Sequence, residues 1–534
     1  MGRVPHYDAI VIGGGHNGLT TAAYLAKAGK QVLLLERRDI LGGATVTEEI
    51  YPGFKYSVAS YVVSLLRPDV IRELKLAEHG LEIVPLESSF SPLPGGDYLV
   101  RWADRDQTRR EIYRHSPHDA DLYPEFGRLM SQMARAVKPL ISMAPPDPTS
   151  LNPKELLELA KLGRYFARDL EQEHFYSLVK LMTMSVADFL DEWFESEPLK
   201  AVMSSSGIIG TFLGPRSPGT AYVMLHHFMG EIDGVFRAWG FPRGGTGAVA
   251  ESIASAARSY GVEIRTSADV EQVIVKKGRA LGVALESGEE IYARRVVSGV
   301  DPKRTFLKLV DESHLPSDFV EDIRRFRIQG SSGKVNLALS ELPHFTGLPA
   351  DGPHLRGFIS VGPSIEYLER AYDDAKYGAF SRRPYLDIVI PSAIDPAMAP
   401  PGKHVMSIFV QHAPYNLNGG WNDAQREAFG DAVVDTLAEF APNIKDAILH
   451  RQVLTPWDLE QVMGLTEGNI FQGELSLHQL FFLRPAAGWA RYRTPVKNLY
   501  LCGSAAHPGG GISSAPGRLA ALEILKNWSK PWSS

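Results

Sequence analysis

The first forty residues alternate between apolar runs and a glycine-rich turn in the order strand, turn, helix, strand. Segment 8–12 is almost wholly apolar, 13–18 is rich in glycine, 22–26 has helical spacing, and 31–36 is a second apolar run. Runs without polar alternation are typical of strands buried on both faces of a parallel sheet. Gly29 falls where a helix would end. The pattern therefore predicts a βαβ unit.

Further along, the periodicity separates a helical stretch from sheet-forming stretches. Residues 115–194 have helical spacing, with one apolar stripe through Leu156, Leu157, Leu159, Ala160 and Leu162. A helix over 246–260 precedes an expected β-meander at 270–275, 280–285 and 289–293, and 296–298 predicts a strand returning to the first sheet. Later strands are expected at 334–339, 386–390, 404–411 and 498–502, with helices at 423–440 and from Ser514 onward.

Length and composition limit the classes of protein that fit. A chain of 534 residues should form two or three units. A net charge of −6 with 44% hydrophobic residues does not indicate a nucleic-acid partner. No apolar run reaches the roughly 18 residues that cross a bilayer, and no leader pattern precedes the first strand. We expect a cytoplasmic protein, with contact to a membrane surface left open.

A single cysteine, Cys502, excludes an intrachain disulfide, a CxxC redox pair and a multi-thiolate metal site. The 16 histidines show no HxH or HExxH spacing, so no protein-bound metal is expected.

The glycine-rich turn has the spacing of a dinucleotide-binding loop. Gly13 permits the tight turn, Gly15 lets backbone amides approach a pyrophosphate, and Gly18 lets the helix pack on the strand. The loop also contains His16 and Asn17. Glu36 ends the second strand, where its carboxylate can accept hydrogen bonds from a ribose. NAD and FAD share this pattern, so these residues leave the cofactor open.

The next residues resemble the second glycine pair of amine-oxidase and phytoene-desaturase flavoproteins. They are Arg37, Gly42, Gly43, Ala44 and Thr45. The resemblance implies FAD, held non-covalently. Many such proteins carry arginine where this chain has Ala44.

The tail supplies a third element of the same kind. An apolar strand leads through Gly503 and Ser504 to the glycine loop Gly511-Ile512-Ser513, just before a helix N-terminus whose amides can stabilise negative charge on a flavin. Val270 lies where these flavoproteins return a strand to the adenine.

Together with segments 41–54, 242–247, 468–471, 476–485 and 507–510, these motifs resemble phytoene-dehydrogenase-like FAD oxidoreductases over nearly the whole chain, and the flavin-type beta-carotene ketolases are also similar. The resemblance implies an α/β fold. We expect a discontinuous Rossmann-like FAD-binding domain (1–110, 236–330 and 490–534) and a sheet-plus-helix substrate domain (111–235 and 331–489).

The resemblance also implies an enzyme that takes hydride from a hydrophobic substrate, for example a polyene or a lipid. No G-x-S-x-G nucleophile is present, and flavin chemistry mainly needs orientation and a dry pocket. Aromatic-rich segments suggest pocket residues, with packing in the core as the alternative: His226, Phe228, Trp239, Phe471, His478, Phe482 and Trp489.

Two polar residues are catalytic candidates. Arg484 lies between apolar neighbours and needs a partner, either a substrate or flavin oxygen or a structural ion pair. His507 could act as an acid or base beside the flavin, or only order its loop. No second dinucleotide loop exists, so oxygen or a quinone is the expected electron acceptor. A ketolase-like oxygen insertion, a redox-neutral isomerisation and a non-catalytic flavin-loaded regulator remain alternatives, and the oligomeric state is open.

Overall fold

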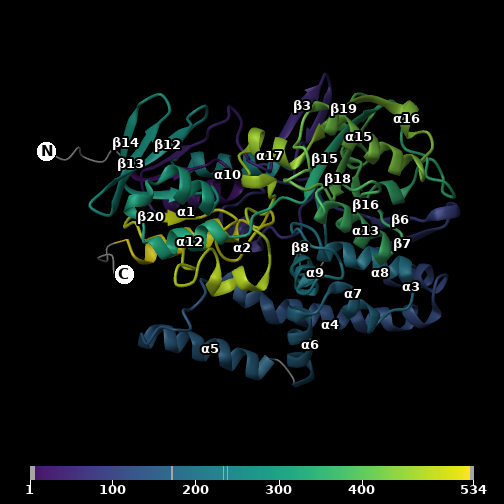
Figure 1. Ribbon diagram of the computed structural model, residues 1–534, viewed down its shortest axis with the longest axis horizontal. Helices are drawn as coiled ribbons and strands as arrows, with labels where there is room; N and C mark the ends of the chain where they lie inside the picture. The colour runs from purple at the N-terminus through teal and green to yellow at the C-terminus, as the bar shows by residue number, and fades with distance from the viewer. Residues whose placement is uncertain (1–6, 170–171, 233, 237, 529–534) are drawn as a thin grey trace.

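The computed structural model describes residues 7–169, 172–232, 234–236 and 238–528. Two large sheets lie side by side, and a layer of helices runs below them (Figure 1). The first and last described residues, Tyr7 and Trp528, lie at the first sheet, Tyr7 at the start of one strand and Trp528 in contact with Arg295 of another.

The first sheet contains the predicted βαβ unit. Strand β1 (Tyr7–Ile12) pairs in parallel with β2 (Val32–Leu35) and β14 (Glu290–Ser298), and helix α1 (His16–Lys27) connects β1 to β2. The sheet also contains β11 (Glu263–Arg265), β12 (Val270–Lys276), β13 (Arg279–Leu285) and β20 (Leu499–Leu501).

Strand β14 joins the meander to the parallel sheet. The sequence predicts separate strands at 289–293 and 296–298, but the structure has one strand whose first half pairs antiparallel with β13 and whose second half pairs in parallel with β1 and β20. The strand expected to return to the adenine at Val270 is β12 of the meander, and the edge strand next to β2 is β11.

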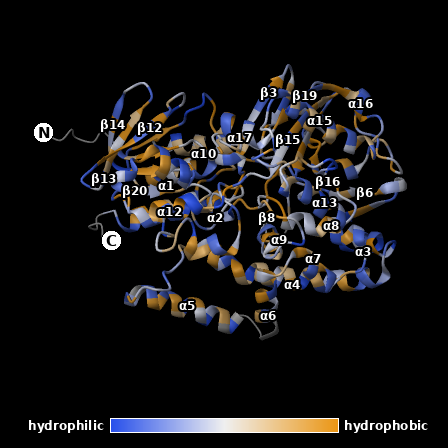
Figure 2. Cartoon of the chain, viewed as in Figure 1, coloured by the Kyte–Doolittle hydropathy of each residue, from blue (hydrophilic) through white to orange (hydrophobic). Residues whose placement is uncertain are grey.

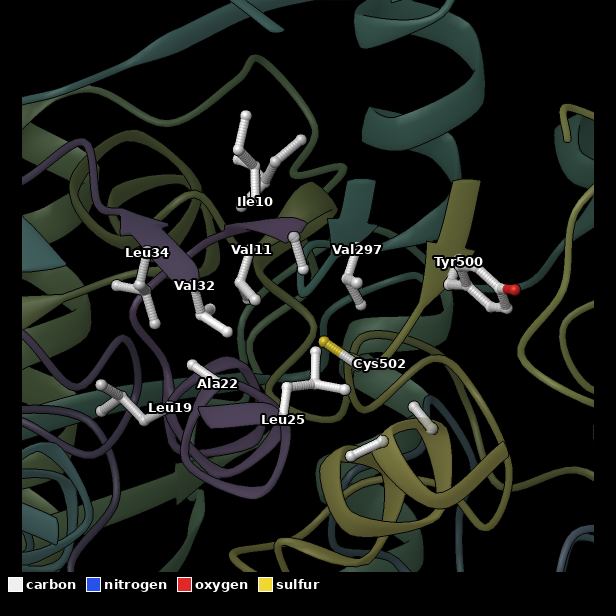
Figure 3. Packing of buried hydrophobic residues seen from close by; sticks show 14 of the residues in the cluster. Ile10, Val11, Leu19, Ala22, Leu25, Val32, Leu34, Val297, Tyr500 and Cys502 are labelled. Carbon is white, nitrogen blue, oxygen red and sulfur yellow. The ribbon is translucent and has the colours of Figure 1, made fainter. Parts of the chain in front are cut away.

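One face of this sheet is covered by α1. Leu19, Ala22 and Leu25 point toward Val11 and Val32, and Ile10 points to the opposite face (Figure 3). Helices α10 (Gly247–Ser259) and α18 (Ala515–Lys526) both pack against α1. The residues around α1 are fully or almost fully buried, so this layer is the core that holds the glycine loop in place.

The second sheet has the strand order β19-β15-β18-β17-β16-β6-β7. Its strands are β6 (Ser88–Pro92), β7 (Tyr98–Trp102), β15 (Ser332–Leu339), β16 (Phe358–Val361), β17 (Tyr385–Val389), β18 (His404–Gln411) and β19 (Ile448–Leu454). Strands β6 and β7 fall within the segment 1–110 that we expected in the cofactor unit, yet they pair with this sheet. The boundary at residue 110 therefore does not coincide with the division between the sheets.

The predicted helical stretch 115–194 lies in the lower layer and forms α4 (Pro117–Ser142), α5 (Pro153–Asp169), α6 (Gln172–Thr183) and α7 (Val186–Asp191). The layer also contains three helices outside the predicted range: α3 (Arg105–Tyr113), α8 (Glu197–Ser204) and α9 (Thr220–Phe228). Apolar and polar residues alternate along α5, which lies at the edge of the layer (Figure 2). The predicted stripe on α5 is partly exposed, since Leu156 and Leu157 are 46% and 55% exposed.

The other elements connect these layers. Short strands form the hairpins β3 (Thr47–Tyr51) with β4 (Phe54–Ser57) and β8 (Glu231–Ile232) with β9 (Val235–Phe236), and the pair β5 (Ile83–Pro85) with β10 (Gly240–Pro242). The remaining α-helices are α2 (Pro68–Glu73), α11 (Pro302–Arg304), α12 (Ser317–Arg325), α13 (Ile365–Lys376), α14 (Pro391–Ile394), α15 (Asp423–Ala438), α16 (Ile444–Ala447) and α17 (Pro456–Met463).

Because α1 and α18 are in close contact, we expect a single methyl group added at Gly517 to lower the stability of the protein. A Cβ added at Gly517 would overlap the carbonyl oxygen of Asn17. We expect Gly517→Ala to destabilise the protein by about 1–3 kcal/mol, the usual cost of overpacking, and to lower the midpoint of thermal unfolding. Gly163→Ala on α5 is the control, because no atom lies within 4 Å of a Cβ there. An equal midpoint for the two variants would contradict the close packing of these helices.

Candidate active site

A cavity of about 1520 Å³ runs between the two sheets and the helical layer. Pockets for one drug-sized ligand usually measure about 300–1,000 Å³. This cavity therefore has room for a dinucleotide and a substrate together. Its lining includes the glycine loop, an aromatic wall, the first turns of α3 and one face of α4 between Asp121 and Arg135.

Most of the residues predicted to bind the cofactor line this cavity. The sequence separates them by almost five hundred positions, and the fold brings them together at one end. They are Gly13, Gly15, His16, Asn17, Gly18, Glu36, Gly42, Gly43, Ala44, Thr45, Ser504, Gly511 and Ile512.

Glu36 lies in the cavity wall with its carboxylate already fixed in orientation. Oε2 accepts a hydrogen bond from the Gly14 amide at 2.7 Å, and Oε1 accepts one from the Arg38 amide at 3.0 Å. A carboxylate offers about four acceptor sites. Glu36 can therefore hold the loop and still accept hydrogen bonds from a ribose.

The N-terminus of α1 opens onto the same space. Gly15 is its N-cap, and a Cβ there would meet a protein atom only at 3.9 Å, the carbonyl oxygen of Gly42. The first-turn amides are thus accessible to an anion, which the positive end of the helix dipole favours. Burial lowers the pKa of His16 to about 4, so this imidazole is neutral at pH 7.

The tail is joined to the first loop by hydrogen bonds. Asn17 Nδ2 donates to Ser504 Oγ at 3.0 Å, and the Gly517 amide donates to Asn17 Oδ1 at 3.3 Å. Thr21 Oγ1 donates to the Gly517 carbonyl at 2.9 Å. These bonds place the second glycine loop beside the first.

Four predicted cofactor residues do not line the cavity. Arg37 donates to the carbonyls of Gln461 and Val462 at the end of α17, and Val270 lies in the meander. The space beside Gly503 is filled by the Gly299 carbonyl, and the Ser513 carbonyl accepts from the Arg67 amide. These four residues therefore lie outside the cavity lining.

The arrangement fits FAD. A helix N-terminus capped by Gly15, an oriented carboxylate at the end of β2 and a glycine loop before α18 all face one cavity with space for two molecules. The N-terminus of α1 suits a pyrophosphate, and the Glu36 carboxylate suits a ribose. The flavin end of the cofactor would reach the glycine loop before α18.

Three of the predicted aromatic residues form the wall beyond the cofactor end. Phe228, Trp239 and Phe471 line the cavity, and His227 stacks on both Trp239 and Phe471 with ring centroids 6.1 Å apart. His227 takes the place predicted for His226. Successive residues on a helix point about 100° apart, and His226 turns toward the Gly510 carbonyl, 3.2 Å away.

The other three predicted pocket residues lie elsewhere. His478 and Phe482 are exposed, with Phe482 44% exposed, and Trp489 packs against Phe319 in the core of the first sheet. The segment 477–483 forms two short 3-10 helices, so its aromatic spacing does not follow a strand or an α-helix.

Arg484 does not line the cavity and is not placed for catalysis. It is fully buried, and its guanidinium donates to the carbonyls of Gly473, Glu474, Gln479 and Ser504 at 2.9–3.3 Å. Burial lowers the pKa of Arg484 to about 9. Backbone carbonyls, rather than the expected substrate oxygen or ion pair, accept hydrogen bonds from Nη1 and Nη2, and the side chain connects the 473–479 segment to the Ser504 loop.

His507 also lies behind the wall. It is 1% exposed, and Nε2 is 2.8 Å from the Leu140 carbonyl of α4. Burial lowers the pKa of His507 to about 4, so it is neutral at pH 7. Its position matches the alternative in which it orders the glycine loop, in this case by attaching it to α4.

Sequence reasoning missed a polar cluster on the substrate side. Tyr61 and Asp387 both line the cavity, and the Tyr61 hydroxyl donates to Asp387 Oδ2 at 2.8 Å. Behind them, the Lys334 ammonium lies 4.3 Å from the centre of the Tyr61 ring and has no hydrogen-bond partner among the described residues. The available signal was a carboxylate in the otherwise apolar strand β17.

Burial shifts both charged groups of this cluster toward neutrality. It raises the pKa of Asp387 to about 7, although the Tyr61 hydrogen bond opposes the shift, and it lowers the pKa of Lys334 to about 7. A carboxyl group with a pKa near neutrality, in a cavity wall, is suited to accept or donate a proton.

The one group of possible metal ligands in the described part of the chain lies away from the cavity. His118, Asp119 and Glu195 converge there, but both Asp119 oxygens accept backbone amides, from Glu195 and Ser196. Glu195 also accepts from the Ser116 hydroxyl. These contacts describe a structural cap of α4.

The fold and cavity define a dinucleotide-binding protein with space for a flavin and a substrate. Comparison with protein families matches residues 18–524 to the family described as flavin containing amine oxidoreductase. The chain belongs to this family and is an FAD-dependent oxidoreductase.

Individual relatives agree with this assignment. The chain is 41% identical to pyridine nucleotide-disulfide oxidoreductase domain-containing protein 2 of Rattus norvegicus, over 98% of this chain and 94% of the relative. It is 27% identical to a subunit of limonene dehydrogenase from Castellaniella defragrans, over 99% and 98%. An oxidoreductase from Methanosarcina mazei shares the fold with a TM-score of 0.61 at 18% identity, covering 97% of this chain and 99% of that one.

None of the helices in the described ranges has the length and apolar character needed to cross a membrane.

The position of Glu36 predicts weaker FAD binding when its carboxylate is removed. Glu36→Ala loses acceptors for the ribose and for the Gly14 amide, and hydrogen bonds to a charged group contribute about 1.5–3 kcal/mol each. We expect the dissociation constant of FAD to rise at least about tenfold, measured by flavin fluorescence on adding FAD to the apoprotein. Glu271→Ala, an exposed position on β12, is the control. Unchanged affinity in Glu36→Ala would contradict the assigned ribose site.

Proposed function

We propose that this protein is a dehydrogenase that holds FAD non-covalently, takes hydride from a hydrophobic substrate and passes the electrons to oxygen or a quinone. The observation that carries the proposal is the single cavity that joins the dinucleotide loops to an aromatic wall. The similarity to a limonene dehydrogenase polypeptide supports a hydrocarbon-like substrate.

When bound, FAD supplies the hydride acceptor, which is the demanding part of the chemistry. The chain's own residues would bind and orient the substrate. Trp239, Phe358 and Phe409 provide flat apolar surfaces, with Trp239 and Phe358 in an edge-to-face contact at 5.3 Å. These rings exclude water from the reacting carbon.

Dehydrogenation also releases a proton, and Asp387 is the group we assign to receive it. Its carboxylate lies in the cavity wall, within a hydrogen bond of the Tyr61 hydroxyl. Loss of one hydride and one proton from adjacent substrate atoms forms a double bond, so the balance closes when Asp387, directly or through Tyr61, takes the proton.

The position of Cys502 supports the non-covalent binding that we propose. This thiol is fully buried between the first sheet and α1, and it is not part of the cavity lining (Figure 3). Burial raises the pKa of Cys502 to about 12, which leaves it protonated and unreactive.

Substrate oxidation should bleach the flavin without oxygen present. We expect anaerobic mixing of the holoenzyme with polyenes, terpenes and unsaturated lipids to identify a class that reduces the flavin, measured by loss of the oxidised absorbance band. Adding oxygen or a quinone should restore the band. Failure of every apolar compound, with reduction by simple amines instead, would contradict the proposed substrate class.

Product mass separates this reaction from its alternatives. Loss of two hydrogens marks dehydrogenation, gain of oxygen marks a ketolase, and unchanged mass with a new double-bond geometry marks an isomerase. A flavin that no compound reduces would favour the regulatory alternative.

The role of Asp387 predicts a specific pH dependence. Below about pH 7 the carboxyl is protonated and cannot accept a proton, so flavin reduction in the wild type should be roughly tenfold slower at pH 6 than at pH 8. Asp387→Asn should lower the rate of flavin reduction about 100-fold. It should also remove the increase in this rate between pH 6 and pH 8. Stopped-flow absorbance measures both effects.

Asp446→Asn on α16, an exposed position, is the matched control. A rise with pH that persists in Asp387→Asn would assign it to another group, with Lys334 as the next one to test.

A further inference from the structure

The outer end of the cavity is lined by arginines. Arg105 and Arg109 come from α3, and Arg128 and Arg135 come from α4; we call these four residues the arginine rim. All four are exposed, whereas Tyr61 and Asp387 in the same cavity are buried. The cavity therefore leads from a buried apolar interior to a cationic opening.

Helix periodicity places the rim residues on the cavity-facing sides of the two helices. Arg105 and Arg109 are four positions apart, and so lie one turn apart on the same face. Along α4 the cavity is lined by Pro124, Arg128, Ser131 and Arg135, while Phe126, Met130, Met133, Ala134 and Val137 on the opposite side are buried. The polar face of α4 thus belongs to the cavity.

The charges on the rim are only partly compensated. Asp121 also lines it and pairs with Arg109 at 2.5 Å. Asp106 is the second acid there. Neither Arg105 nor Arg128 has an ion pair among the residues that the structure describes.

Arg101 extends the positive charge inward from the rim. It lies on β7 in the cavity wall, donates to Ser89 Oγ at 2.9 Å, and is close enough to Asp387 to lower the pKa of that carboxyl. The lining of the cavity thus contains buried aromatic rings, the half-buried Arg101 and the exposed arginines of the rim.

We propose that the substrate is an amphiphile with an anionic headgroup, a carboxylate or a phosphate, held at the arginine rim while its apolar chain extends toward the flavin. This inference rests on the proposed function, because it names the substrate class of the same cavity. Guanidinium groups bind both anions through paired N–H donors. A purely hydrocarbon substrate would leave these arginines without a role in binding.

Binding measurements test the headgroup without requiring turnover. The probes are oleate, oleyl phosphate, oleyl alcohol and methyl oleate, added to the holoenzyme and followed by perturbation of the flavin spectrum and by native mass spectrometry. We expect an anionic probe to bind at least about tenfold more tightly than the alcohol or ester. Raising the salt concentration should weaken the binding of the anionic probes and leave the binding of the alcohol and the ester unchanged.

The double variant Arg105→Gln and Arg128→Gln should lose this preference while keeping its affinity for oleyl alcohol. The control Arg110→Gln and Arg164→Gln removes the same charge from exposed positions outside the cavity lining. Flavin content and unfolding midpoint should match the wild type in both. Comparison of oleate with oleyl phosphate identifies which headgroup the rim prefers.

The inference would be overturned if oleate and oleyl alcohol bound equally well to the wild type. It would also be overturned if the control variant lost the preference for the anionic probe to the same extent. It would also fail if the Arg105 and Arg128 variant lost binding to phosphatidylglycerol vesicles but kept its affinity for oleate, since the rim would then be a membrane contact. If a neutral hydrocarbon reduced the flavin equally in all variants and no acid bound, the proposed function would stand and the anionic headgroup would be wrong.

Discussion

The packing of α18 against α1 is the constraint on which the rest of the site depends. Gly517 has no side chain, so α18 can approach the backbone of Asn17 closely. This close packing brings Asn17 within hydrogen-bond distance of Ser504 and Gly517. The two glycine loops therefore face one cavity from segments at opposite ends of the chain. Because buried helices pack at near-crystalline density, a displacement of α18 would move the loop that precedes it.

Buried polar side chains hold the outer shell of this arrangement. Arg484 binds backbone carbonyls of two segments, and His507 attaches the tail to α4. Both groups lose solvation, and hydrogen bonds to carbonyls compensate for that loss. Arg484 and His507 therefore have structural roles. The titratable group that faces the cavity is Asp387, which comes from the second sheet.

Local sequence patterns were sufficient to predict those parts of the site that are formed by residues close together in the chain. The loop 13–18 and Glu36 could be recognised because a turn, a helix N-terminus and a strand end all follow from adjacent positions. The aromatic wall could be predicted only in part. Phe228, Trp239 and Phe471 reach the cavity and His478, Phe482 and Trp489 do not, because the direction of a side chain in an irregular segment depends on the packing around it.

The glycine loop with Glu36, the βαβ unit and much of the helical layer could be predicted from neighbouring residues, and a single cysteine excluded disulfide chemistry. Which polar residues face the substrate space depends instead on how distant segments pack. Tyr61 and Asp387 are more than three hundred positions apart, and the arginine rim combines residues of two helices, α3 and α4. Such contacts arise from the pairing of distant strands and helices, and no local periodicity in the sequence records that pairing.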